Sequence, residues 1–262
     1  MTAAASPRRL PWLGTATVFQ RELARTFRLY WMTVAGPVMT ALLFLVVFRT
    51  ALGGEAAELD GLPVLSFLAP GLIMLALVMT AFSTSAYTVV HAKIERYIED
   101  DLMAPIGPAG WTAAFAGASV VSALAVAAAV GLAIAPFVDF GPVHLGWVAV
   151  HGVGAATLLS LLGLAAGIWA RTWDKVEAVV TFAVVPFGYL SGTFYPLDRL
   201  PDALSATIGA NPVYFAVDGL RHGLTGKGAT DPAVGALVLL LACIAAWALC
   251  HALVARGYKL KA

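Results

Sequence analysis

The side chains that could do chemistry in this sequence are few and scattered. The segment GLTGKGAT (223–230) comes closest to a phosphate-binding loop, but the pattern GxxxxGK[ST] fails at Arg221 and at Gly228. His144 and His151 lie seven residues apart, without the convergent ligands from several segments that a metal site requires. The sequence also lacks HExxH, GxSxG and paired CxxC motifs. We therefore expect no ATP hydrolysis, metal centre or cofactor in this chain.

A charged stretch, HAKIERYIEDDLMAPIGPAG (91–110), is more informative. Six charged side chains fall within nine positions and an apolar pair follows them: Lys93, Glu95, Arg96, Glu99, Asp100 and Asp101, then Leu102 and Met103. Such a short segment between two apolar runs can be a solvated turn. It can equally dock a partner, with the charges setting the register and the apolar pair supplying a buried anchor. The residues alone leave both interpretations open.

Residues 15–31 have the pattern of a basic amphipathic helix. The two faces are an apolar stripe of Phe19, Leu23, Phe27 and Tyr30 and a basic stripe of Arg21, Arg25 and Arg28. Just before an apolar run, this pattern is typical of a helix lying on the cytoplasmic leaflet. A simple membrane anchor would show the same residues. The segment lacks the uninterrupted apolar core of a signal peptide, so we expect the N-terminus to be retained.

Composition places these segments in a membrane protein. Of the 262 residues 60% are hydrophobic and 12% are charged, about half the charged share of a soluble domain. A span needs around 20 mostly apolar residues. Six windows satisfy this, which predicts an all-α protein with six transmembrane helices at 32–52, 64–90, 112–138, 144–170, 176–194 and 233–255. Cys243 and Cys250, seven residues apart on one predicted helix, are expected to be packing residues.

The distribution of Lys and Arg predicts the orientation. With a cytoplasmic N-terminus, twelve of the 16 basic residues fall on the inner side, which also puts the C-terminus in the cytoplasm. The net charge of +1 and the absence of a long basic block give no indication of nucleic-acid binding.

Residues 191–226 interrupt the apolar pattern before the last span. Pro196, Pro201 and Pro212 divide this stretch into two pieces, 197–209 and 212–224, each too short to cross a bilayer. Asp218 and Arg221 are three residues apart and can pair on one helical face. Irregular backbone at membrane depth must be covered by protein or line a cavity. We therefore expect two re-entrant half-helices that form a lid or gate.

Three motifs carry a family resemblance. LSGTFYPLDRLP (190–201), NPVYFAVDGLRHGLTG (211–226) and IEDDLMAPIGP (98–108) resemble segments of the permease subunits of ABC-2 type exporters, including the YadH-like and NodJ-like bacterial members. Several positions match over two separated segments of the chain, in the right order. The resemblance covers essentially the whole chain and implies one transmembrane domain over residues 1–262.

The resemblance implies partners and sites. Two permease chains, as a homodimer or heterodimer, would form the pathway in a bacterial inner membrane, among membrane lipid. Two copies of a separate ATPase subunit, which binds ATP and magnesium, would sit on the cytoplasmic face. The helix 15–31 and the coupling segment 91–105 would contact the ATPase through Arg21, Glu22, Arg25, Lys93, Arg96 and Glu99. The segment 191–226 would form an extracellular gate that includes Gly192, Tyr195, Pro196, Pro212, Asp218 and Arg221.

The expected function is outward movement of an amphipathic, lipid-linked or saccharide-type molecule. The alternative is a secondary transporter driven by an ion gradient, which typically has ionisable residues at mid-span. Here Arg49, Asp139 and Glu177 all lie near the ends of the apolar windows. A membrane-embedded lipid enzyme should show clustered His, Asp and Glu at one membrane face, with the spacing of a metal or acid–base site. The sequence favours the exporter.

Overall fold

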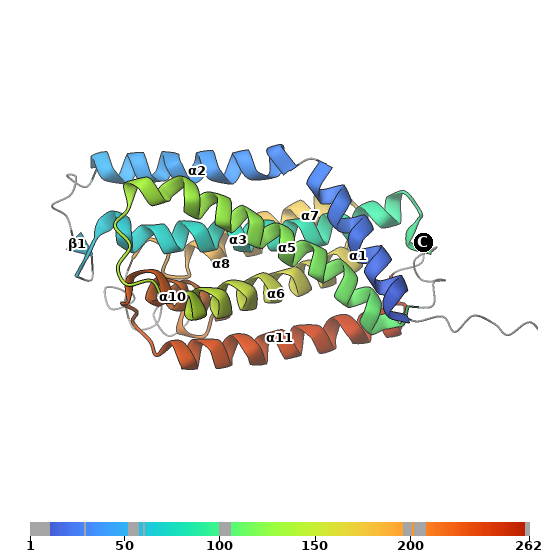
Figure 1. Ribbon diagram of the computed structural model, residues 1–262. Coiled ribbons are helices and arrows are strands. Elements are labelled where there is room, and N and C mark those ends of the chain that lie inside the picture. Colours follow the sequence, from blue (N-terminus) through green and yellow to red (C-terminus); the bar gives the residue numbers. More distant parts are fainter. Residues whose placement is uncertain are drawn as a thin grey trace, which may run out of the picture.

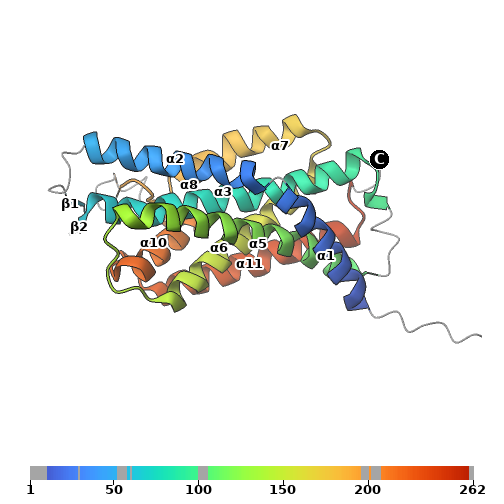
Figure 2. The ribbon, with the colours of Figure 1, turned by 45° about the horizontal axis from the view of Figure 1, so that its top comes forward.

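The structure is a computed structural model, which describes residues 11–28, 30–51, 58–59, 61–99, 106–195, 201 and 208–259. Long helices run side by side along one axis, and a separate helix, α1 (Pro11–Arg28), crosses them at one end (Figure 1 and Figure 2). Two residue pairs, β1 (Glu58–Leu59) and β2 (Leu62–Pro63), form a short antiparallel hairpin at the other end. The predicted all-α class is confirmed for the described residues.

Among the residues that the structure describes, five helices are long and apolar enough to cross a membrane. They are α2 (Tyr30–Ala51), α3 (Val64–Ile94), α5 (Pro108–Ile134), α6 (Leu145–Trp169) and α11 (Pro232–Ala255). A 3-10 turn, η2 (Ala135–Phe137), extends α5. These helices coincide with five of the six predicted windows. Helix α3 continues four residues beyond its window, so its last turn contains the start of the predicted coupling segment.

The remaining window, 176–194, is helical but irregular. Three pieces of 7, 5 and 5 residues follow one another: α7 (Trp173–Val179), the π-helix η3 (Val180–Val184) and α8 (Val185–Tyr189). We call this run α7–η3–α8. None of the pieces alone is long enough to span a bilayer, so the sixth crossing stays a prediction. Short π-helical stretches within helices often mark functional sites.

The two ends of the bundle differ in their polar contacts. At the α1 end, Lys93 at the end of α3 contacts the last carbonyl groups of α6, and α11 ends nearby. At the hairpin end, Ser66 of α3 donates a hydrogen bond to the carbonyl of Asp139, and Lys227 reaches the carbonyl of Gly61. Helix α1 and the C-terminal end of α11 therefore lie at the same end of the bundle (Figure 1).

Helix α10 (Pro212–Thr225) is the second predicted half-helix and lies at the hairpin end (Figure 1). Its limits follow from local sequence. Asn211 caps the N-terminus by accepting a hydrogen bond from the Val213 amide, and Pro212 occupies the first turn. Gly226 ends the helix with a φ of +72°. The first predicted half-helix, 197–209, lies mostly outside the described residues.

Helix α1 is a separate helix, as predicted, and its position on the membrane surface stays a prediction. It packs against α5 and the residues before it through small side chains: a Cβ on Gly14 would lie 2.6 Å from Ile106, and one on Gly110 would lie 2.5 Å from Thr15. Val18 is buried, whereas Phe27 is exposed. Helix α5 covers part of the predicted apolar stripe, because a Cβ on Gly117 of α5 would lie 3.3 Å from the Phe19 ring.

The core is centred on α3, most of which is buried. Helix α6 approaches it most closely at two glycines. A Cβ on Gly163 would lie 2.3 Å from the Phe82 carbonyl oxygen, and one on Gly167 would lie 2.7 Å from that of Ala86. Backbones approach this closely only across small residues, which is a common way to join membrane helices.

This contact gives a stability prediction. Replacing Gly163 with Ala should force α6 away from α3 and lower the free energy of unfolding by about 1–3 kcal/mol, the usual cost of overpacking. Thermal unfolding of the detergent-purified protein measures the effect. Gly146→Ala is the matched control on the same helix, because no atom outside the adjacent residues and the nearby backbone of α6 lies within 4 Å of its added Cβ. Equal melting temperatures for the two variants would contradict the close α3–α6 contact.

Candidate functional site

Glu22 is the buried centre of a charged cluster at the α1 end. Its side chain is only 2% exposed, although a carboxylate is seldom buried unless it is paired. The pairing comes from its own helix: Arg21 and Arg25 each place a guanidinium nitrogen 2.8 Å from a Glu22 carboxylate oxygen. Three of the predicted docking residues therefore form one cluster, in which Glu22 is inaccessible and the two arginines are partly exposed.

Tyr97 joins this cluster to the turn that follows α3. Arg25 donates a hydrogen bond of 3.1 Å to the Tyr97 hydroxyl, and the Arg21 guanidinium lies 5.0 Å from the centre of the Tyr97 ring. Both contacts link α1 to a segment more than 70 residues away in sequence. Because α1 and this turn are held together, a force on one is transmitted to the other.

Of the other three predicted docking residues, Lys93 is packed against α6, whereas Arg96 and Glu99 are exposed. Lys93 donates hydrogen bonds to the carbonyl groups of Gly167, Ile168 and Ala170 and so caps the C-terminus of α6. Arg96 and Glu99 are exposed on the turn after α3, where Arg96 has a φ of +61°. The rest of the predicted coupling segment, 100–105, lies outside the described residues.

A row of side chains continues from Tyr97 to the start of α7. The ring of His91 lies 6.0 Å from that of Tyr97 and 6.2 Å from that of Trp173. Trp173 in turn lies 5.5 Å from Tyr87, whose hydroxyl donates a hydrogen bond to Glu177. This row, which we call the aromatic row, connects α1 through the end of α3 to α7.

Arg221 is the central residue of the hairpin end. Its side chain is 6% exposed and contacts two other segments of the chain. It donates hydrogen bonds to the carbonyls of Gly192 (2.7 Å) and Phe67 (3.3 Å), and its guanidinium lies 4.0 Å from the centre of the Phe67 ring. Gly192 adopts a φ of +69°, which favours glycine. Arg221 therefore joins α10 to α3 and to the turn after α8.

Asp218 holds the turn between α10 and α11. It accepts hydrogen bonds from the amides of Ala229 (2.9 Å) and Thr230 (2.8 Å), and another from the Thr230 hydroxyl (2.6 Å). The nearest Arg221 nitrogen is 3.7 Å away, which confirms the predicted pairing on one helical face. A carboxylate that is 1% exposed is thereby satisfied by both charge and hydrogen bonds.

The other predicted gate residues have different positions. Pro212 forms the first turn of α10, and Pro196 lies outside the described residues. Tyr195 is half-buried. A second polar contact closes the region: the Asn211 amide donates hydrogen bonds to the Ser191 hydroxyl (2.9 Å) and the Phe187 carbonyl (3.3 Å).

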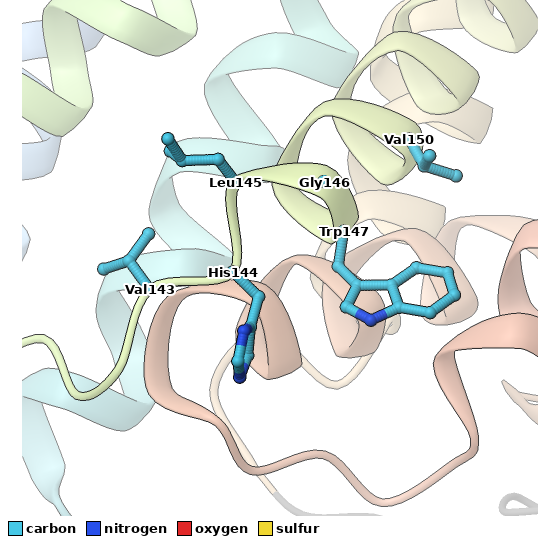
Figure 3. Close-up of a pocket in the computed structure, with 6 residues that line it drawn as sticks. All are labelled: Val143, His144, Leu145, Gly146, Trp147 and Val150. Carbon is cyan, nitrogen blue, oxygen red and sulfur yellow. The ribbon is translucent and has the colours of Figure 1, made fainter.

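A hollow of about 680 Å³ lies at the start of α6. Figure 3 shows His144 and Trp147 projecting from this turn in a different direction from Val143 and Leu145. The His144 ring lies 6.4 Å from that of His222, whereas His151, one further turn along, is completely buried. The described residues hold no cluster of three or more His, Cys, Asp or Glu side chains suited to a metal.

Several of these contacts were not predicted. Asn211 precedes a proline, a helix-start signal that identifies it as a cap. Tyr97, Trp173 and Glu177 come from separate segments, and nothing in their spacing indicates that they meet. Phe67 contributes a backbone carbonyl as well as its ring, and any residue type can supply the carbonyl.

The contacts of Arg221 give a second stability prediction. Arg221→Met should remove two hydrogen bonds and leave Asp218 buried without its cation, which typically costs about 3–5 kcal/mol. The melting temperature should fall, and the turn at 226–231 should become more sensitive to added protease. Lys227→Met removes one exposed cation from that turn and should cost less than about 1 kcal/mol. If both variants unfolded alike, Arg221 would not hold this end together.

Comparison with known proteins is consistent with this architecture. The family model described as ABC-2 type transporter matches residues 14–225. The inner membrane transport permease YadH of Escherichia coli K12 is 31% identical over 96% of this chain and 98% of its own length. Nodulation protein J of Azorhizobium caulinodans is 28% identical over 86% of this chain and 88% of its own length. The chain belongs to the ABC-2 type transporter family and is a membrane subunit of an ABC transporter.

Proposed function

We propose that this chain is the permease subunit of an ATP-driven exporter in a bacterial inner membrane. It moves an amphipathic, lipid-linked or saccharide-type molecule outward through a pathway between two permease chains. A separate ATPase subunit, present in two copies, binds ATP and magnesium and docks at the α1 end. Family membership and the similarity to an inner membrane transport permease support this assignment.

The observation that carries the docking proposal is the exposed turn after α3. Arg96 and Glu99 face solvent directly beside α1, and Tyr97 between them binds the Arg21–Glu22–Arg25 cluster. Exposed charges of both signs can fix the register in which a partner binds, whereas buried ion pairs hold the elements of this chain in place. In this arrangement Arg96 and Glu99 contact the ATPase, while Glu22 and Lys93 position the elements that carry them.

The aromatic row supplies a route for movement. A displacement of the turn at Tyr97 acts on Trp173 and on the Tyr87–Glu177 hydrogen bond, both of which hold α7. Helix α7 continues through η3 into α8, after which Gly192 binds Arg221. The ATPase therefore acts on the gate residues at the hairpin end through α7–η3–α8, which we take as the sixth crossing.

The packing of α3 favours a pathway between two chains. Small and aromatic residues fill the α3–α6 contact, so a pathway through the centre of one chain would have to disrupt it. Helix α2, in contrast, is largely exposed. An ion-gradient transporter is the alternative, and the middle turns of the five long helices contain no Asp, Glu, Lys or Arg to support it.

Charge reversal at Glu99 tests the docking site. Glu99→Arg should lower the amount of ATPase that co-purifies in mild detergent and the ATP hydrolysis of the recovered complex, by about fivefold or more for each. Glu58→Arg is the control, because Glu58 is equally exposed on the hairpin end. Co-purification and hydrolysis should equal the wild-type values in that variant.

Three outcomes separate the possibilities. If ATPase co-purification and ATP hydrolysis fall in Glu99→Arg alone, the result supports docking of the ATPase at the turn after α3. If both quantities fall in Glu58→Arg alone, the ATPase would dock at the hairpin end, which would contradict the proposed orientation. If no ATPase co-purified with the wild-type chain under conditions that preserve other ABC complexes, an ion gradient would become the energy source to test.

A further inference from the structure

An apolar groove runs along one side of the bundle, and the first turn of α10 forms part of its wall. Its volume is about 640 Å³, and its walls come from α3, α6, α7–η3–α8, α10 and α11. Among the described residues that line it, Asn211 is the only polar one. Its amide is already bound to Ser191 and to the Phe187 carbonyl. The volume lies in the range of sites that bind small molecules.

The depth of the groove indicates its occupant. Its lining extends from Leu158 to Ala166 on α6 and from Ala242 to Leu249 on α11, lengths of roughly 10–12 Å at the usual helix rise. One leaflet of hydrocarbon is about 15 Å thick. The walls on these two helices belong to candidate membrane spans, so the groove opens to hydrocarbon. A single acyl chain has the matching length and polarity.

Three cations lie where the same helices end, at the α1 end. Lys93 Nζ is 3.0 Å from the Ala170 carbonyl oxygen, so it is next to Arg171. Lys259 Nζ lies 5.4 Å from the centre of the Trp169 ring. None of the three forms an ion pair with a carboxylate in the described part of the chain. Basic residues beside an interfacial Trp are typical of an anionic headgroup site.

We propose that the groove and these cations together bind one anionic membrane phospholipid. One of its two acyl chains fills the groove, and its phosphate lies beside Lys259 and Arg171. Bulk lipid solvates an acyl chain as well as the groove does, so the groove contributes shape and the cations contribute the preference for negative charge. The site goes beyond the transport function and does not depend on where the ATPase docks.

Lipid retention tests this site directly. The wild-type chain, in nanodiscs containing equal amounts of phosphatidylglycerol and phosphatidylcholine, is released into a delipidating detergent and weighed by native mass spectrometry. It should retain one phosphatidylglycerol per chain. The double variant Arg171→Gln, Lys259→Gln should bind it on the order of tenfold more weakly. Ala245→Phe, which fills the groove, should reduce retention of either lipid.

Two matched variants serve as controls. Ala248→Phe adds the same ring to an exposed position of α11 outside the groove, and Lys227→Gln removes a cation at the hairpin end; both should retain lipid as the wild type does. Melting temperatures check that each variant is folded. Equal retention of the two lipids, or unchanged retention in both test variants, would overturn the proposal. A disulfide between two copies carrying Ala183→Cys would place a second chain in the groove and would overturn it too.

Discussion

The structure depends on one constraint: hydrocarbon offers no hydrogen-bond partner to a backbone or a charge. The chain therefore crosses as helices that satisfy their own backbone, and close contacts such as that of Gly163 with the Phe82 carbonyl hold the helices together. In the described part of the chain, charged side chains lie towards the two ends of the bundle, where Glu22, Asp218 and Arg221 are buried and paired. Glu22 has two arginines, and Arg221 has a carboxylate and two carbonyls. A functional movement must shift these contacts without leaving a charge unpaired.

The same constraint explains why the two ends can be coupled. Helices α3, α5, α6 and α11 are packed into one continuous core. The run α7–η3–α8 is different because it contains a π-helix. At one end, Trp173 contacts His91 and Glu177 accepts a hydrogen bond from Tyr87. At the other end, Gly192 accepts a hydrogen bond from Arg221. An irregular helix with polar attachments at both ends can shift more easily than the regular helices around it. In this account it carries the effect of ATP hydrolysis from the α1 end to the gate.

Sequence reasoning predicted those parts of the fold that local physics determines. Apolar length placed five spans, and Asn-Pro at one end and Gly226 at the other correspond to the limits of α10. The Asp218–Arg221 pair followed from helical spacing. What could not be predicted depends on which distant segments meet. Glu22 and Lys93 are residue types usually found at the surface. In the structure, however, Glu22 is buried and paired with two arginines of its own helix, and Lys93 caps α6. The partners of Arg221 are mainly backbone carbonyls, which have no signature in sequence.

Site-specific photo-crosslinking in native membranes tests the central claim, that the α1 end receives the ATPase, most directly. A photoreactive phenylalanine analogue is incorporated at position 99 in one variant and at position 58 in another, and the products are identified by mass spectrometry. The account predicts a crosslink to an ATPase chain from position 99 and none from position 58. A crosslink from position 58, or none from position 99 in a complex that still contains the ATPase, would contradict it.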